Sequence, residues 1–504
     1  MDMRRFFKGL LLLAAFLGGS VPILAKAADR MSQETAAPIY AAELGSLYQP
    51  ADLPKLYAAH LLIEDYFSAY TESLRKPIVA QLQATGIDPN ILGRLARIRL
   101  SWPELAAGVY YFNEQVGTHE VKYFLGVPSG YKRSVSWPLV VKLPALNAFL
   151  TDPAPDADQV VHIYTSWITD ELTAHPDALV LMPLLNLREL YGPSLVGMNT
   201  VFQPILDAAD HANVDPARVY LMGHSMAAHA VWNLGLHYAM YLAAICPLAG
   251  GADADWQRLR LMNLRNTLPV VWADSDDQVI PVRQSRDIVE ALRKLKIDVD
   301  YTETNNIGHL PPPDVVEQAY QKMRARVRQL YPAHISLQSD RMETLFNRMD
   351  WFQLYQELET GPNHTVRIQI GTGAIHLQNP FGMDATLNQN TVTMTTVNAD
   401  SMRLYFNSQM VDFSKPVTVI VNGRKRFSGM LTQSIDEMLK DQLFLGRGWR
   451  YYTAVVDLDL SADTSPAPPR VTPQPTANGA TSRPHGKITV YNDDGTVNRV
   501  IESP

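Results

Sequence analysis

Cysteine is almost absent from this sequence. Cys246 is the single cysteine in 504 residues, so the chain can form no internal disulfide and no thiolate metal site. Its neighbours in the run 242–247 are mostly apolar and offer no group that would stabilise a thiolate. We therefore predict that Cys246 is a buried packing residue of a strand rather than a nucleophile.

Two further kinds of motif are missing. The 13 histidines are scattered and none stands in an H-E-x-x-H pattern, which gives no support for a metal site. Neither G-x-G-x-x-G nor G-x-x-x-x-G-K-[ST] occurs, so no phosphate-binding loop is indicated. The expected chemistry is one that needs no cofactor.

Positive charge is also scarce, since the formal net charge is −7. The densest basic cluster, Arg424-Lys425-Arg426, follows the strand-like run 417–423 and is interpreted as the far strand of a hairpin. A nucleic-acid partner is therefore not suggested. With 46% hydrophobic and 19% charged residues, the composition is that of a globular chain long enough for two or three domains.

The first 27 residues have the pattern of an export signal. Arg4-Arg5 and Lys8 precede the apolar run 9–24, and Ala25-Lys26-Ala27 has the small-x-small form of a signal-peptidase site. A retained membrane anchor is the alternative, but the run is short for one, and no later segment has the apolar length of a spanning helix. We predict a periplasmic or secreted bacterial protein with no membrane span in the mature chain.

The most informative stretch is Gly223-His224-Ser225-Met226-Ala227. It lies between the apolar run 218–222 and the Ala-rich segment 228–238, which predicts a strand, a sharp turn and a helix. Such a turn holds the serine hydroxyl exposed at the end of a strand, on a strained backbone with small neighbours. Ala227 stands where the pattern G-x-S-x-G has its last glycine. The alternative is an ordinary turn with a serine N-cap.

A serine nucleophile needs a base and an acid that orients this base. A predicted strand at 268–273 leads into Asp274, Asp276 and Asp277, and another at 297–303 leads to Gly308-His309. Because the carboxyl ends of parallel strands meet at one edge of a sheet, these residues are expected on the same edge as Ser225. From this pattern alone Asp274 and Asp276 remain alternatives to Asp277, as the acid or as parts of a solvated turn.

Over residues 119–331 the sequence resembles the α/β-hydrolase superfamily, within it the group of secreted esterases, depolymerases and predicted peptidases. The resemblance is carried by the segments 123–131, 137–141, 214–220, 242–251, 277–285 and 308–309. It implies a doubly wound, mostly parallel sheet. It also implies that Ser225 is the nucleophile, that Asp277, four residues before Pro281, is the orienting acid, and that His309 is the general base.

The resemblance is weakest in the loop that supplies half of the oxyanion hole. Relatives carry His-Gly after the strand that corresponds to 138–143, whereas this chain has Pro144, which has no N–H to donate. The implied donors are the backbone amides of Met226 and of Ala145 or its neighbour Leu146. Lys142 is either an edge residue that reaches solvent or a group that assists the anion.

Three further histidines lie near Ser225 in the sequence. The side chain of His224 is expected to point away from the hydroxyl, so we interpret it as a supporting or packing residue. His229 and His237 lie on the following helix and are predicted to be structural.

The expected organisation is a signal peptide (1–27), a helical region (28–118), the catalytic domain (119–335), a β-rich domain (336–460) and a Pro-rich linker and tail (461–504). Apolar residues at helical spacing over 53–84, and a further helix after Asp88-Pro89, support the helical region. A short helical stretch at 351–358 precedes alternating strands, the last of which ends at the hairpin signal Asn422-Gly423. One hairpin is predicted in the tail near 487–491. For the β-rich domain we favour structural support over polymer or cell-surface binding.

These observations predict an exported serine hydrolase that acts on carboxylic esters, either small molecules or polymer-derived. A serine peptidase of the same fold is one alternative, because ester and amide hydrolysis share this apparatus. A non-catalytic binding protein that retains the fold is the other, motivated by Ala227 and by the missing His-Gly.

Overall fold

The structure, a computed structural model, describes residues 30–116, 119–144, 155–185, 191–252, 255–343, 345–356, 365–367, 374–460, 487–491 and 497–502. The predicted signal segment 1–27 and most of the predicted linker and tail (461–504) lie outside these ranges. A search of the described residues finds no helix with the length and apolar character needed to cross a membrane.

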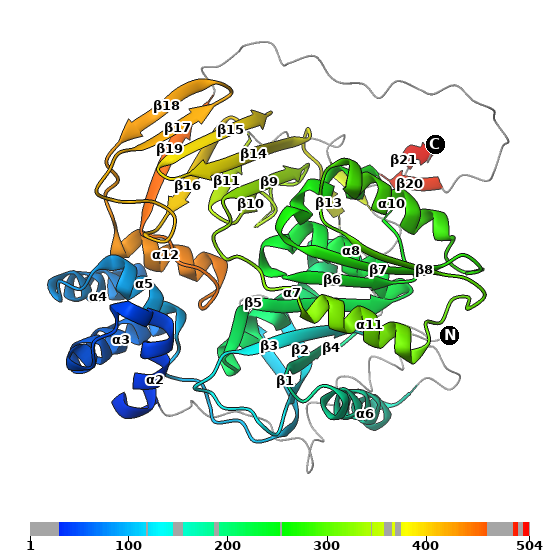
Figure 1. Ribbon diagram of the computed structural model, residues 1–504, viewed down its shortest axis with the longest axis horizontal. Coiled ribbons are helices and arrows are strands. Elements are labelled where there is room, and N and C mark those ends of the chain that lie inside the picture. The colour runs from blue at the N-terminus through cyan, green and yellow to red at the C-terminus, as the bar shows by residue number, and fades with distance from the viewer. Residues whose placement is uncertain are drawn as a thin grey trace.

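A sheet of eight strands, in the order β1-β2-β4-β3-β5-β6-β7-β8, forms the centre of the chain (Figure 1). The first two strands form an antiparallel hairpin, β2 runs antiparallel to β4, and the remaining neighbours are parallel. The inner strands are continuous apolar runs because both faces of the sheet are covered. The strands span Gly108–Val116 (β1), His119–Val127 (β2), Trp137–Leu143 (β3), Leu179–Pro183 (β4), Val214–His224 (β5), Ala244–Leu248 (β6), Leu268–Asp274 (β7) and Asp300–Thr304 (β8).

Helices cover both faces of this sheet. On one face α6 (Ala157–Ala174) packs on β2 and β4, and α11 (Pro313–Arg324) packs on β6 and β7 (Figure 1). On the other face lie α7 (Leu195–His211), α8 (Met226–Tyr238) and α10 (Val282–Lys294). Three short elements, η4 (Ala239–Tyr241), α9 (Asp255–Leu259) and η5 (Leu261–Asn266), complete this part. The doubly wound sheet predicted from the sequence is therefore confirmed.

The sheet begins earlier than predicted. Strand β1 falls inside the region 28–118 that the sequence analysis assigned to helices, yet it pairs with β2 along its whole length. Its central residues Tyr110, Tyr111 and Phe112 are buried. This edge strand was missed because its aromatic run acquires a partner only through the hairpin with β2.

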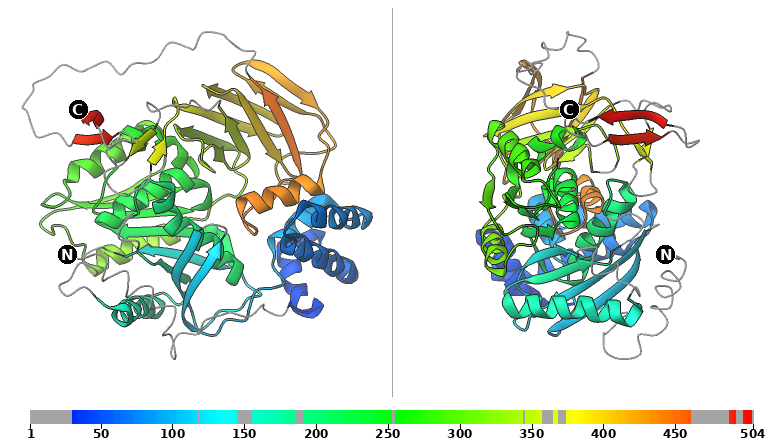
Figure 2. Two further views of the ribbon diagram at one scale, coloured as in Figure 1. Left: turned by 180° about the vertical axis from the view of Figure 1, so that it is seen from behind. Right: turned by 90° about the vertical axis from the view of Figure 1, so that its right-hand side faces the viewer.

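The N-terminal helices pack on one another and on the C-terminal part of the chain (Figure 2). They are α2 (Gln33–Leu44), α3 (Leu53–Ser68), α4 (Glu72–Ala84) and α5 (Pro89–Arg97), with the short turns η1 (Gly45–Leu47) and η2 (Pro50–Asp52). The apolar pattern at 53–84 thus forms two helices. Their apolar faces meet α12 (Ile435–Leu445), and a Cβ on Gly93 of α5 would lie 2.3 Å from the ring of Tyr451. This contact requires glycine at that position.

Two sheets build the β-rich part, in the orders β18-β17-β15-β14-β9 and β10-β11-β16-β19. The strands are β9 (His334–Ser339), β10 (Arg348–Met349), β11 (Phe352–Tyr355), β14 (Phe381–Asn388), β15 (Thr391–Val397), β16 (Ser401–Phe406), β17 (Val417–Val421), β18 (Arg424–Gly429) and β19 (Ala454–Asp459). The helix predicted at 351–358 is wrong, because β11 pairs with the adjacent β10 and with the distant β16, and the long-range pairing with β16 outweighs local spacing. The predicted hairpin at Asn422-Gly423 is present, with positive φ angles of 50° and 78°.

Four short strands form a further sheet in the order β13-β12-β20-β21. They span Thr365–Arg367 (β12), Ala374–His376 (β13), Lys487–Tyr491 (β20) and Val497–Glu502 (β21). The antiparallel pair β20–β21 is the predicted tail hairpin. The strand β12 is one of the alternating strands predicted after residue 358, and residues 368–373, which follow it, lie outside the described residues.

Candidate active site

Ser225 forms the turn between β5 and α8, as the sequence predicts. Its backbone has φ 59° and ψ −121°, a left-handed conformation that is strained for a residue with a side chain. The N–H of Ser225 donates to the Leu248 carbonyl of β6 at 2.9 Å, which fixes the turn to the sheet. The side chain does not cap α8, so the N-cap alternative does not describe this serine.

Small neighbours make room for the turn. A Cβ on Gly223 would lie 2.8 Å from the Cβ of Ala227 and 3.0 Å from its backbone, closer than such atoms approach one another. A Cβ on Gly250 would lie 2.5 Å from the Cβ of Ala228. Ala227 is therefore tolerated in the last place of the pattern because Gly223 has no side chain to meet its methyl group.

The structure brings His309 to Ser225. His309 follows β8, and its Nε2 lies 2.8 Å from the Oγ of Ser225. Its Nδ1 lies 2.8 Å from Oδ2 of Asp277. The imidazole is 24% exposed, so a substrate can reach it from solvent. Serine, histidine and aspartate therefore stand in one line at the carboxyl edge of the sheet.

Asp277 is held as a buried hydrogen-bond acceptor. Its side chain is 2% exposed, and Oδ1 accepts the N–H groups of Val279 at 2.8 Å and Ile280 at 2.9 Å. Burial alone would raise the pKa of Asp277, but the hydrogen bonds from His309 and these two amides outweigh it and hold the pKa below its usual value. An ionised Asp277 places the imidazole proton on Nδ1 and leaves Nε2 free to accept the serine proton.

The two alternative acids have other partners. Asp274 is buried and accepts hydrogen bonds from Thr304, Ile307 and Gly308. Asp276 is exposed, and its carboxylate accepts the N–H of Asn306 at 2.7 Å. Of the three acids, Asp277 is the one that bonds the His309 ring, while the other two contact the loop that carries it.

His224 also contacts this loop. Its Nε2 lies 2.7 Å from the backbone carbonyl of His309, and the two rings are 4.8 Å apart. Burial lowers the pKa of His224, so the ring is neutral near pH 7 and its Nε2–H donates to that carbonyl. The sequence analysis predicted a supporting residue here, but its spacing gave no signal for this contact.

Of the two predicted oxyanion donors, the structure describes one. Met226 is the first residue of α8, where a backbone N–H has no acceptor within the helix. Leu143 of β3 pairs with Gly223, so the end of β3 lies beside the serine turn. Ala145, the other implied donor, lies outside the described residues, as does Leu146.

Lys142 points to the face of the sheet that carries α6. Its ammonium forms an ion pair with Glu171, whose carboxylate is also near His175. The two residues line a hollow of about 420 Å³ together with Leu143, Pro144, Trp167, Asp170, Ala174 and Met182. The positive charge of Lys142 is therefore paired with the carboxylate of Glu171.

The other predicted structural residues are placed as expected. Nδ1 of His229 is 2.7 Å from the Gly251 carbonyl, and Nδ1 of His237 is 2.8 Å from the Asn233 carbonyl. Cys246 is buried in β6, and burial raises the pKa of its thiol to about 12. A protonated, enclosed thiol is no nucleophile.

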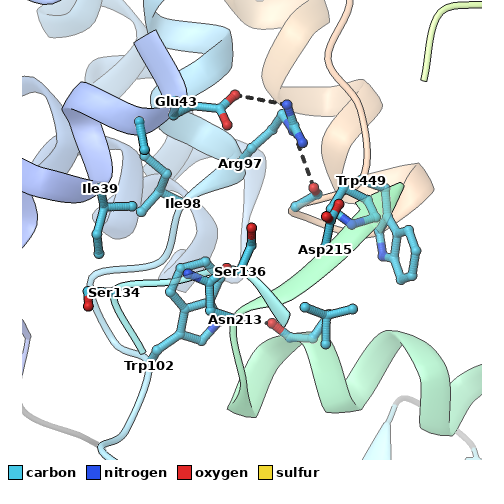
Figure 3. A pocket seen from close by; sticks show the side chains of 15 residues that line it. Ile39, Glu43, Arg97, Ile98, Trp102, Ser134, Ser136, Asn213, Asp215 and Trp449 are labelled. Carbon is cyan, nitrogen blue, oxygen red and sulfur yellow. Dashed lines mark hydrogen bonds and ion pairs between the residues drawn. The ribbon is translucent and has the colours of Figure 1, made fainter. Parts of the chain in front are cut away.

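A cavity of about 200 Å³ lies at the opposite end of β5 (Figure 3). Trp102, Asn213 and Asp215 line it, and Arg97 lies between the Glu43 carboxylate at 2.8 Å and the Gly448 carbonyl at 3.3 Å. Since β5 has 11 residues, the cavity is separated from Ser225 by about 30 Å. It is therefore not part of the site around Ser225.

One group of side chains is composed of metal-ligating types. Glu114, Asp207 and His211 lie within 4.8 Å of one another beside β1 and α7. Nε2 of His211 is 3.0 Å from the Glu114 carboxylate, and the Tyr123 hydroxyl donates to Asp207 at 2.8 Å. Ion pairing between His211 and the carboxylates accounts for this arrangement, and β1 lies at the edge of the sheet, four strands from β5.

No protein-family model matches the chain, and neither does any curated protein. Among solved structures it is similar to a thermostable esterase at 21% identity, over 44% of this chain and 63% of that one, with a TM-score of 0.36. A ferulic acid esterase has 14% identity over 43% of this chain and 96% of its own, with a TM-score of 0.32.

Dipeptidyl peptidase 4 from Porphyromonas gingivalis has 12% identity over 44% of this chain and 35% of its own, with a TM-score of 0.33. The matched part thus spans less than two thirds of the thermostable esterase and of the peptidase. The strand order and the β5–α8 turn give this chain the α/β-hydrolase fold.

Proposed function

We propose that this chain is an exported serine hydrolase that cleaves carboxylic esters. The observation that carries the proposal is the bridge made by His309, with Nε2 at 2.8 Å from Ser225 Oγ and Nδ1 at 2.8 Å from Asp277 Oδ2. Nucleophile, base and orienting acid have this mutual geometry in serine hydrolases of unrelated folds. The contact also favours a catalytic chain over a binding protein that merely retains the fold.

In the first half of the proposed reaction, Nε2 of His309 takes the proton of the Ser225 hydroxyl while Oγ attacks the ester carbonyl carbon. The carbonyl oxygen becomes an oxyanion that accepts the Met226 N–H and a second backbone amide, for which we propose Ala145. The intermediate then expels the alkoxide, which takes the proton from Nε2 and leaves as the alcohol. Ser225 is left acylated.

In the second half, His309 takes a proton from water, and the resulting hydroxide attacks the acyl carbon. Collapse of the second tetrahedral intermediate breaks the bond to Oγ, and the proton on Nε2 returns to Ser225. The carboxylic acid is released and the enzyme is restored. Throughout, ionised Asp277 stabilises the imidazolium that forms, without taking its proton.

Hydrolysis of nitrophenyl esters from acetyl to palmitoyl tests the proposal, with peptidyl nitroanilides assayed in parallel. We expect ester turnover by the mature protein and loss of it in Ser225→Ala and His309→Ala. Ser136→Ala, at the cavity end of β5, is the matched serine control and is expected to retain turnover. Cleavage of the anilides in preference to the esters would favour the peptidase, and a folded protein that cleaves neither would favour the binding protein.

A further inference from the structure

Asp274 is the last residue of β7, and its side chain is completely buried (0% exposed). Four donors point at its carboxylate. Oδ1 accepts the N–H of Asp276 at 2.9 Å and that of Gly308 at 3.0 Å. Oδ2 accepts the Thr304 hydroxyl at 2.8 Å and the Ile307 N–H at 3.3 Å. Three of the four donors, on Thr304, Ile307 and Gly308, come from the end of β8 and the loop that follows it.

Two of these donors belong to the loop that carries His309. This loop has left-handed backbone at Asn306, with φ 58°, and at Gly308, with φ 86°. Such a backbone persists where the surroundings determine it. The carboxylate of Asp274 accepts the N–H groups of Ile307 and Gly308, and these hydrogen bonds hold the strained backbone immediately before His309.

The carboxylate of Asp274 is ionised at neutral pH. Burial alone would raise the pKa of Asp274, but the donors from Gly308, Thr304, Asp276 and Ile307 outweigh burial and lower the pKa. An ionised acceptor makes shorter and stronger hydrogen bonds than a neutral one. Thr304 is itself tied to the sheet, because its hydroxyl accepts the Trp272 indole N–H at 3.1 Å.

We infer that Asp274 is a positioning residue for the reaction, a buried clamp that holds the 306–309 loop so that His309 reaches both Ser225 and Asp277. The inference rests on the proposed serine hydrolase and adds to it a second buried acid with a separate task. Asp277 orients the ring of His309, whereas Asp274 orients the backbone from which the ring extends. Asp274 makes no bond to the ring and is not a catalytic residue.

The test compares Asp274→Asn and Asp274→Ala with the wild type. The Asn variant keeps the shape of the side chain but turns an NH₂ group toward two of the four donors, and the Ala variant removes every acceptor. Asp207→Asn is the matched control, since Asp207 is also a buried aspartate (6% exposed) that accepts a hydroxyl, from Tyr123, but lies on α7, which packs on β2 and β4. Active sites are counted in each protein by stoichiometric labelling with a fluorophosphonate.

We expect both Asp274 variants to keep the number of labelled sites per folded molecule. Per site, kcat is expected to fall about 100-fold in Asp274→Ala, the loss that a small misplacement of a catalytic group produces, and less in Asp274→Asn, with KM little changed. In proton NMR spectra, the low-field signal of the His309 Nδ1 proton shared with Asp277 is expected to broaden or disappear. If Asp274→Ala does not fold, Asp274→Asn decides.

The inference is overturned if kcat per site and the low-field signal are unchanged in Asp274→Asn and Asp274→Ala. It is also overturned if the loss of activity is wholly explained by fewer labelled sites, because a merely structural role would give that result. Any loss of activity in Asp207→Asn is expected to be of this structural kind. A wild type that neither turns over esters nor reacts with the fluorophosphonate would refute the proposed function itself. The two failures are therefore distinguishable.

Discussion

The two ends of β5 differ in packing, in charge pairing and in backbone strain. At the Val214 end, the strand enters a cavity where the N-terminal helices, the large sheet and the segment around Trp449 meet. The polar groups there are neutralised in ion pairs, such as Arg97 with Glu43. At the other end, Ser225 has a strained backbone, and its hydroxyl faces a half-buried imidazole.

The packing at the Val214 end of β5 stabilises the fold, whereas the Ser225 end has a strained backbone. Enclosed packing and paired charges form a junction between the regions at one end of the strand, whereas the strained turn at the other end is held by local contacts such as the Ser225 N–H to the Leu248 carbonyl. A change at the Ser225 end should therefore affect turnover first. A change at the junction should affect the free energy of unfolding first.

The largest expected effect is that of Asp277→Asn. An amide in this place favours the wrong tautomer of His309, so we expect kcat to fall by about 10⁴-fold while the fold is retained. Ester hydrolysis and circular dichroism measure the two quantities. Asp287→Asn, a partly exposed aspartate on α10, is the control. A loss smaller than tenfold in Asp277→Asn would mean that another group orients His309.

The next largest effect is expected for Gly223→Ala. The new Cβ would meet the Ala227 Cβ at 2.8 Å, so β5 and α8 must move apart at the serine turn. We expect a loss of about 1–3 kcal/mol in the free energy of unfolding, together with at least a tenfold loss of kcat/KM. Combining it with Ala227→Gly should restore part of both, since the contacts at 3.0 Å with the backbone of residue 227 remain. Full activity in Gly223→Ala would show that β5 and α8 can accommodate a methyl group at residue 223, against this prediction.

The junction end should respond to acid. Burial alone would raise the pKa of Glu64, but the ion pair with Arg447 at 2.7 Å and further bonds lower it to about 2, from an ordinary value of 4.5. Because the folded pKa lies below the unfolded one, the stabilisation is complete above pH 4.5 and is lost as the pH falls toward 2. The change is on the order of 3 kcal/mol.

Urea unfolding at a series of pH values measures this loss. We expect Glu64→Gln to be less stable than the wild type at pH 7 and to lose less stability on acidification. Glu290→Gln, on the exposed face of α10, should follow the wild type. Identical slopes in Glu64→Gln and the wild type between pH 4.5 and pH 2 would contradict the assigned pairing.

The smallest effect is expected for Lys142→Met. Lys142 lies opposite Met222 of β5, close to the serine turn, but its charge is paired with Glu171 rather than directed at the substrate. We expect kcat to change less than threefold in ester hydrolysis, about the effect of losing a peripheral, solvent-screened charge. A loss of 100-fold or more would restore the hypothesis that Lys142 assists the oxyanion.

Much of the fold and of the candidate site could be predicted because the signals are local. Ser225 and Asp277 follow apolar runs that predict strands, and His309 follows the mixed-polarity strand predicted at 297–303. Parallel strands place their carboxyl ends together. The hairpin at Asn422-Gly423 was likewise contained in two adjacent residues. Such features need no knowledge of distant partners.

What the sequence could not provide depends on contacts between distant segments. The strand β11 is fixed by its pairing with β16, where Phe352 lies opposite Leu404, so local spacing did not predict it. The bond from His224 to His309 joins residues 85 positions apart. The contacts of Asp274 with the His309 loop exist only once β7 and β8 lie side by side.

The most direct test of the account is to locate the site of covalent reaction. The mature protein is treated with a fluorophosphonate and digested, and the modified peptide is identified by mass spectrometry. We predict a single adduct on Ser225, formed slowly or not at all in His309→Ala. An adduct on another serine, or an unmodified Ser225 in folded and ester-active protein, would contradict the assignment of Ser225 as the nucleophile.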